Sequence, residues 1–437
     1  MKSLLTERDR HILRIAIPSI VSNITVPLLG LVDVAITGHL GSAAYIGAIA
    51  VGGMLFNVIY WLFAFLRMGT SGLTSQALGR RRPAQCVSLL RKSLTVALAI
   101  ASALILFQVP VRELGLIIMQ PTGDVRSFTI TYFSICIWGA PASLGLFALN
   151  GWFIGMQNSR SPMAVAIAQN VINIVVSLCL VFFFGMKVEG VAAGTLVAQW
   201  SGFLLAALLC RKYYGKMLRR HARERGEGIS AGALFRINRD IFLRTLCLVS
   251  VLLFFTAAGS RQGEVILAVN TLLMQLYLLV SYVMDGFANA AEAMSGKYWG
   301  AGNGMAFRQT VKRCFLWGAA CTALFTLLYI IGGEPFLHLL TDEGNVVEAS
   351  AAYVAWAWLV PACSVGAFIW DGVFIGITAS RQMLLSSFAA AAVFFSVYAL
   401  TIPTLHNHGL WLAFLCFMLT RGLVQSWLYA TNIRKKI

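Results

Sequence analysis

Asn150-Gly-Trp-Phe-Ile-Gly155 recurs 221 residues later as Asp371-Gly-Val-Phe-Ile-Gly376. Each copy is followed after a few residues by a Ser-Arg pair, at Ser159-Arg160 and at Ser380-Arg381. Further pairs share this offset to within one residue: Gly79 with Gly300, Arg91-Lys92 with Lys312-Arg313, and Pro141 with Pro361. The pattern indicates that the chain consists of two sequence-related halves.

The composition places both halves in a membrane. Only 12% of the 437 residues are charged and 59% are hydrophobic, whereas a soluble domain carries about 25% charged residues. Apolar segments close to the ~20 residues that span a bilayer recur along the whole chain. We therefore predict an all-α integral membrane fold of about twelve transmembrane helices, at residues 10–39, 43–70, 88–110, 126–154, 161–185, 189–211, 241–260, 264–296, 308–332, 348–377, 382–402 and 409–432.

The distribution of basic residues predicts the orientation. If both termini are cytoplasmic, four of the 34 Lys and Arg residues fall in outer loops: Arg112, Arg126, Lys187 and Arg261. This is the bias of the positive-inside rule. Because each half has an even number of spans, the halves have the same orientation and a pseudo-twofold axis along the membrane normal should relate them. We predict two six-helix lobes, residues 1–212 and 241–437, with a cleft between them.

The basic linker between the lobes, residues 213–240, has two interpretations. It anchors the topology on the cytoplasmic side, or it forms a specific lipid or regulatory site. The net charge of +17 does not indicate nucleic acid, since the basic residues lie between hydrophobic spans rather than along one polar face.

Motifs for catalysis and cofactors are missing from the sequence. The nine cysteines show no metal-binding spacing, and neither a P-loop nor a hydrolase motif occurs. We expect no enzyme activity, no metal and no cofactor. The energy for transport should then come from an ion gradient.

Apart from acids at the first position of a span, four acidic residues lie inside predicted spans, where burial is costly and usually functional: Asp33, Asp285, Glu292 and Asp371. Pro27 should bend the first span, and Asp33 should lie in the outer half of the membrane. A desolvated carboxyl group can bind and release protons near neutral pH, which makes Asp33 a candidate proton carrier. The alternative is an acid near the helix end that the outer solution solvates.

Asp285 and Asp371 should lie in the inner half of the membrane, where a carboxylate could recognise an organic cation. Alternatively, either acid pairs with Arg67 or Arg421 or caps a backbone break, and Glu292 pairs with Lys297. Asn150 replaces Asp371 in the first half, and we expect function at such departures from symmetry. Aromatic and Met residues that suit apolar cations surround these positions, although each is individually typical of core or lipid-facing residues: Met274, Tyr277, Tyr282, Met284, Trp370 and Phe374.

Several motifs resemble those of the multidrug and toxic compound extrusion (MATE) transporters, and specifically their DNA-damage-inducible F branch in bacteria. The first span carries Pro18, Pro27, Leu31-Val-Asp33 and Gly38-His39-Leu-Gly41. Further matches follow along the whole chain: Phe65-Leu-Arg67-Met, Gly72-Leu-Thr, Asp285-Gly-Phe-Ala and Asp371-Gly-Val-Phe-Ile-Gly376.

The resemblance implies export of lipophilic organic cations and toxic compounds, by antiport with protons or sodium, through a V-shaped bundle in the bacterial cytoplasmic membrane. It implies that Asp33 is the proton-coupling residue and that Asn173 and Thr195 join it. Ser177 stands where related members carry an acid, and one carboxylate fewer weakens a sodium site, which favours a proton gradient. We expect a monomer to function alone.

Two other functions compete with proton-coupled drug export. Sodium-coupled antiport is one, and flipping of a lipid-linked oligosaccharide by a related two-lobed bundle is the other. An anionic pyrophosphate lipid needs a basic cavity, whereas the acids predicted inside the spans outnumber the arginines there. An intramembrane enzyme and a channel are disfavoured, because no catalytic set occurs and a repeated two-lobe build suits alternating access.

Overall fold

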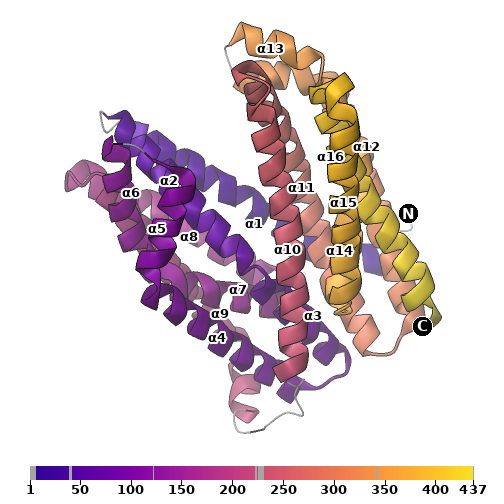
Figure 1. Ribbon diagram of the computed structural model, residues 1–437. Coiled ribbons are helices and arrows are strands. Elements are labelled where there is room, and N and C mark those ends of the chain that lie inside the picture. The colour runs from indigo at the N-terminus through magenta and orange to yellow at the C-terminus, as the bar shows by residue number, and fades with distance from the viewer. Residues whose placement is uncertain are drawn as a thin grey trace, which may run out of the picture. The chain divides into compact units, whose positions relative to one another are not determined.

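The computed structural model describes residues 6–38, 42–121, 123–221, 224, 231–340 and 343–436. Every regular element within these ranges is helical (Figure 1), which confirms the predicted all-α membrane fold. The side chains of Asp33 and Pro27 lie outside the described part, although both residues belong to the first helix.

The helices of the first half carry six of the predicted spans. They are α1 (Glu7–Gly38), α2 (Ala43–Leu62), α3 (Phe65–Gly79), α4 (Pro83–Leu106), α5 (Gln108–Met119), α6 (Gly123–Cys136), α7 (Ala140–Gly155), α8 (Arg160–Leu178) and α9 (Val188–Arg220). The segments α2–α3 and α6–α7 each make one long apolar span with an irregular turn inside it.

The α-helices in the described part of the second half are six long ones and one short one. They are α10 (Ala231–Ser260), α11 (Glu264–Gly300), α12 (Gly304–Leu340), α13 (Gly344–Ala351), α14 (Val354–Gly376), α15 (Ser380–Leu405) and α16 (Asn407–Leu428). Among the described residues, 11 helical segments are long and apolar enough to cross a membrane, and α1 precedes them. Each of these segments overlaps one of the predicted spans.

The contacts divide the chain into two compact units, which we call the first and second units. The first unit is Val21–Ser230, and the second combines Ala231–Ile437 with the start of α1 up to Ile20. The predicted lobe over residues 1–212 assigned the start of α1 to the first half, whereas the structure groups it with the second unit. The predicted linker 213–240 is also shorter in the structure, because α9 continues to Arg220 and α10 begins at Ala231.

The repeat is visible as the same packing in both units. A Cβ atom on Gly151 would collide with the carbonyl oxygen of Arg67, and one on Gly372 would collide with that of Ala288. Both pairs of positions are 221 residues apart, and the two contacts join α3 to α7 and α11 to α14. The turns after α7 and α14 match as well, with left-handed residues Gln157 (φ 62°) and Thr378 (φ 56°).

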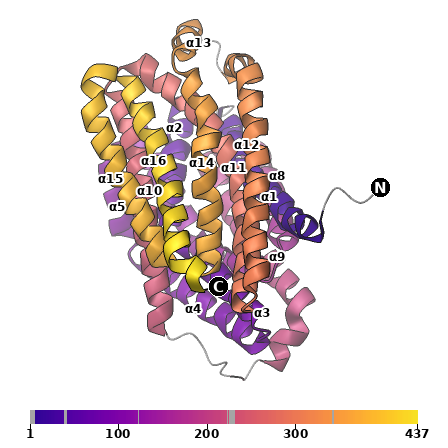
Figure 2. The same cartoon turned by 90° about the vertical axis from the view of Figure 1, so that its right-hand side faces the viewer.

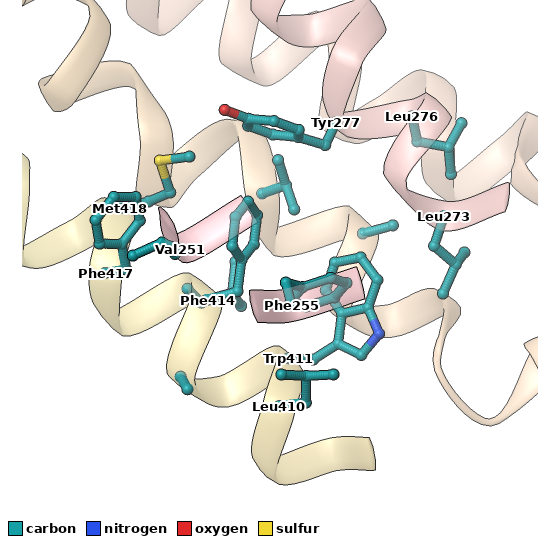
Figure 3. Packing of buried hydrophobic residues seen from close by; sticks show 14 of the residues in the cluster. Val251, Phe255, Leu273, Leu276, Tyr277, Leu410, Trp411, Phe414, Phe417 and Met418 are labelled. Atoms are coloured by element: carbon teal, nitrogen blue, oxygen red, sulfur yellow. The ribbon is translucent and has the colours of Figure 1, made fainter. Parts of the chain in front are cut away.

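The core of the second unit is aromatic. Phe255 packs edge-on against Trp411, and Phe414 packs edge-on against Tyr277 (Figure 3). Asn270 fixes one end of this core, because its side-chain oxygen accepts hydrogen bonds from Asn407 Nδ2 (2.9 Å) and Trp411 Nε1 (2.8 Å). The amide pair and the indole are thus hydrogen-bonded in an apolar environment, as buried polar groups must be.

Asp9 attaches the start of α1 to α12 within the second unit. Thr6 and Asp9 form a capping box, in which Thr6 N donates to Asp9 Oδ2 (2.9 Å) and Asp9 N donates to Thr6 Oγ1 (3.3 Å). Trp317 Nε1 donates to Asp9 Oδ1 (3.1 Å), and Arg313 lies 3.4 Å from Asp9 Oδ2. Burial alone would raise the pKa of Asp9, but the bonds from Thr6 and Trp317 and the charge of Arg313 lower it below its ordinary value.

We expect Asp9→Asn to destabilise the protein by about 1.5–3 kcal/mol at pH 7, the scale of hydrogen bonds to a charged group. Since the folded state lowers this pKa, the contribution is complete above the unfolded pKa near ~3.9 and is lost as the pH falls below it. Thermal unfolding in detergent should therefore separate the variant from the unmodified protein at pH 7, and the difference should shrink as the pH falls below the unfolded pKa. Glu7→Gln, an exposed acid in the same turn, is the control, and an equal effect there would contradict the role of Asp9.

Candidate functional site

A buried polar cluster joins α8 and α9 in the first unit. Asn173 Nδ2 donates a hydrogen bond to Thr195 Oγ1 at 3.1 Å. Asn173 and Ser177 are both 0% exposed, and they lie one turn apart on α8. Gly194 on α9 faces Ser177, and a side chain at Gly194 would collide with the Ser177 hydroxyl. The structure therefore brings together the three residues that the resemblance singled out on these helices.

Two oxygens of this cluster remain available. Among the described residues, neither Asn173 Oδ1 nor Ser177 Oγ has a hydrogen-bond partner. A buried polar atom without a partner costs free energy, so such a pair of oxygens favours a ligand, a proton-bearing group or an ion. One turn before Asn173, Asn170 Nδ2 donates to the backbone oxygen of Thr25 in α1 at 2.7 Å. That bond ties α8 to α1, the helix that carries Asp33.

The second unit contains a buried charge cluster around Asp371. Both Arg244 and Arg421 donate to Asp371 Oδ2, the latter at 2.6 Å, and Gln425 Nε2 donates to Asp371 Oδ1 at 2.7 Å. All three charged residues are at least nine-tenths buried. Asp285 also lies close enough for its charge to act on Arg244.

These ion pairs correct the expectation that Asp371 recognises an organic cation. Its carboxylate is already compensated by two guanidinium groups, so it offers no net negative charge to a ligand. The alternative given above, pairing with Arg421, describes its state. Asp285 and Asp371 lie near the same residue, since the charges of both carboxylates act on the Tyr277 hydroxyl group.

The remaining predicted residues fall in less specific places. Tyr277 and Met284 belong to the hydrophobic core of the second unit, which corrects their assignment to a substrate surface. Pro18 is buried in the part of α1 that belongs to the second unit. In the first unit, Asn150 is half-buried, and its Oδ1 has no hydrogen-bond partner among the described residues.

Sequence reasoning missed Arg244, Gln425 and Asp240. The predicted span 241–260 puts Arg244 close to its start, but α10 starts at Ala231 and places Arg244 more than three turns inside a helix. Asp240 is buried and accepts a hydrogen bond from Ser380 Oγ at 3.0 Å. The sequence could have indicated Arg244. A buried acid such as Asp371 needs a cationic partner, and Arg244 lies near the start of the apolar span predicted at 241–260.

A helical membrane fold with a repeated half and a buried polar cluster in each unit is typical of membrane transporters. The family model described as MatE matches residues 18–179 and 241–400, and the chain belongs to this family of transporters. The resemblance noted in the motifs is thereby confirmed.

The comparisons also identify similar individual proteins. DNA damage-inducible protein F of Escherichia coli (strain K12) is 37% identical over 96% of this chain and 92% of its own length. A probable multidrug resistance protein NorM of Thermotoga maritima is 21% identical over 80% of this chain and 76% of its own length. A crystal structure of MATE in the bent conformation matches with a TM-score of 0.87 at 17% identity, covering 99% of this chain and 96% of that chain.

Proposed function

We propose that this transporter exports lipophilic, cationic toxic compounds by antiport with protons. The observation that carries the proposal is the buried Asn173–Thr195 pair, with the unpartnered oxygens of Asn173 and Ser177 beside it. These oxygens lie on the helix that Asn170 ties to α1, where Asp33 supplies the titratable carboxyl group.

Protons are preferred to sodium because of the oxygens in this cluster. Asn173, Thr195 and Ser177 supply only neutral oxygens, so Asp33 would be the single carboxylate of the site. A bare sodium ion is held best by several charged oxygens, whereas a carboxyl group in a desolvated site binds a proton covalently. Protonation of Asp33 from outside would neutralise it, bend α1 at Pro27 and release the exported compound.

The cationic nature of the substrate now rests on Asp33 rather than on Asp371. If proton and cation compete for one carboxylate, the two ligands exclude each other, which is the condition for antiport. The arginines around Asp371 are relevant to the flippase alternative, which needs a basic cavity. Two positive charges, of Arg244 and Arg421, contact the single negative charge of Asp371. Since both guanidinium groups are buried against Asp371, they give a basic cluster and not a basic cavity.

The test is efflux of a fluorescent lipophilic cation from proteoliposomes with an imposed gradient. We expect an inward proton gradient to drive efflux, a sodium gradient at fixed pH to have no effect, and Asp33→Asn to abolish the proton-driven flux. Asp124→Asn, the same change at an exposed residue, is the matched control. Sodium-driven efflux, or full activity of Asp33→Asn, would overturn the proposal. Movement of a lipid-linked oligosaccharide in place of the cation would favour a flippase.

A further inference from the structure

A basic pocket lies between the start of α1 and the start of α12 in the second unit. It has a volume of about 1000 Å³. It is lined by Thr6, which precedes α1, by Glu7, Arg8 and His11 of α1, by Tyr298 of α11, and by Gln309, Lys312, Arg313, Phe315 and Leu316 of α12. None of these residues belongs to the proton cluster or to the charge cluster described above.

The charge of this pocket is positive. Arg8, Lys312 and Arg313 face one acid, Glu7, within the lining. The neighbouring Asp9 pairs with Arg313 at 3.4 Å, so the positive excess rests on Arg8 and Lys312 against Glu7. Arg313 lies near Asp9 but keeps 39% of its side chain exposed, so it can still reach a second anion.

A separate apolar groove lies farther along α12. The groove has a volume of about 490 Å³ and is lined by Ala319, Thr322, Ala323, Thr326, Leu327 and Ile330 of α12 and by Ala362 and Val365 of α14. Helices α12 and α14 pack side by side (Figure 2). The pocket and the groove share one face of α12, since their residues recur at spacings of three and four.

The distance along this face matches a lipid. At a rise of about 1.5 Å per residue, Ala323 lies about 16 Å along the axis from Lys312, within reach of an acyl chain. Small residues at 319, 323 and 362 leave room for such a chain. Under the positive-inside orientation predicted above, the basic pocket faces the cytoplasmic leaflet, which carries the anionic lipids.

We propose that this pocket and groove together bind one anionic phospholipid of the cytoplasmic leaflet. Arg8, Lys312 and Arg313 contact the phosphate headgroup, and the groove holds an acyl chain. A free phosphate would use the basic pocket alone, so the groove farther along α12 is what identifies the lipid. The proposal does not depend on the coupling ion or on the exported compound.

The experiment measures lipid binding to the purified full-length protein. Native mass spectrometry in detergent, with added phosphatidylglycerol or phosphatidylcholine, gives the affinity for each lipid. Since each basic residue near an anionic lipid contributes about fivefold in affinity, we expect Arg8→Gln with Lys312→Gln to weaken phosphatidylglycerol binding about 30-fold. Phosphatidylcholine binding should change little. Arg91→Gln, at the equivalent exposed position of the first half, is the matched control.

A second variant tests the groove with every charge kept. Ala323→Phe should fill the groove and weaken phosphatidylglycerol binding about tenfold, and inorganic phosphate at the same concentration should not displace the lipid. Unchanged selectivity for phosphatidylglycerol in Arg8→Gln with Lys312→Gln would overturn the proposal. Displacement by inorganic phosphate, with no effect of Ala323→Phe, would also overturn it and would assign the pocket to a free anion.

Discussion

Asp371→Asn should destabilise the protein by about 3–5 kcal/mol, because it leaves two buried guanidinium groups without their shared carboxylate. Arg244 of α10 and Arg421 of α16 both pair with Asp371 of α14, and Gln425 completes the hydrogen bonding. One acid therefore holds three helices of the second unit together. Asp285 lies close enough for its charge to act on Arg244 as well.

The order of a variant series tests this explanation. Arg421→Gln removes one cation and leaves Asp371 paired one-to-one with Arg244, so it should cost less than Asp371→Asn. The double variant Asp371→Asn with Arg421→Gln should recover part of the loss, because only one buried cation then lacks a partner. Midpoints of thermal unfolding in detergent measure the series. An Asp371→Asn variant as stable as the unmodified protein would show that the arginines find water or other partners at no cost.

Loss of transport in these variants separates structure from substrate recognition. If Asp371 acts only through its ion pairs, the double variant should regain transport together with stability. A direct role in binding the exported cation would instead leave the stabilised double variant inactive.

The spans and the repeat could be predicted because they depend on local sequence. Long apolar segments and the 221-residue offset are visible without a structure, and the glycines of the offset turned out to be contact points. The start of α1 could not be assigned in this way. Its place in the second unit depends on the bond between Asp9 and Trp317, which are 308 residues apart.

The candidate site was predictable in the first unit and less so in the second. Asn173 and Thr195 followed from motifs, and their side chains meet. In the second unit, the residue types alone did not distinguish a binding acid from a paired one. Asp371 is paired because Arg244 lies inside α10, and Met284 is fully buried because its face of α11 turns to the core. The pairing of Asp371 and the burial of Met284 depend on where α10 begins and on which side of α11 faces the core. Residue composition does not determine either.

Gly372→Ala and Gly151→Ala should each destabilise the protein by about 3 kcal/mol, the upper end of the cost of overpacking. In both places the new methyl group would meet a backbone carbonyl oxygen, of Ala288 in the second unit and of Arg67 in the first. A side chain could rotate away, but a carbonyl within a packed helix cannot, so the helices α11 and α14, or α3 and α7, would have to separate. Because the contact is the same in both halves, the two losses should be similar.

Gly53→Ala is the matched control for this pair of variants. Gly53 lies within α2, and a Cβ atom there meets nothing within 4 Å. Since Ala favours a helix over Gly by roughly 0.5–1 kcal/mol, this variant should be neutral or slightly more stable. Thermal unfolding in detergent compares the three. If Gly372→Ala behaves like Gly53→Ala, the close approach of α11 and α14 is not required, and the repeated glycines need another explanation. If all three lose stability equally, the effect belongs to the helices and not to the contacts between them.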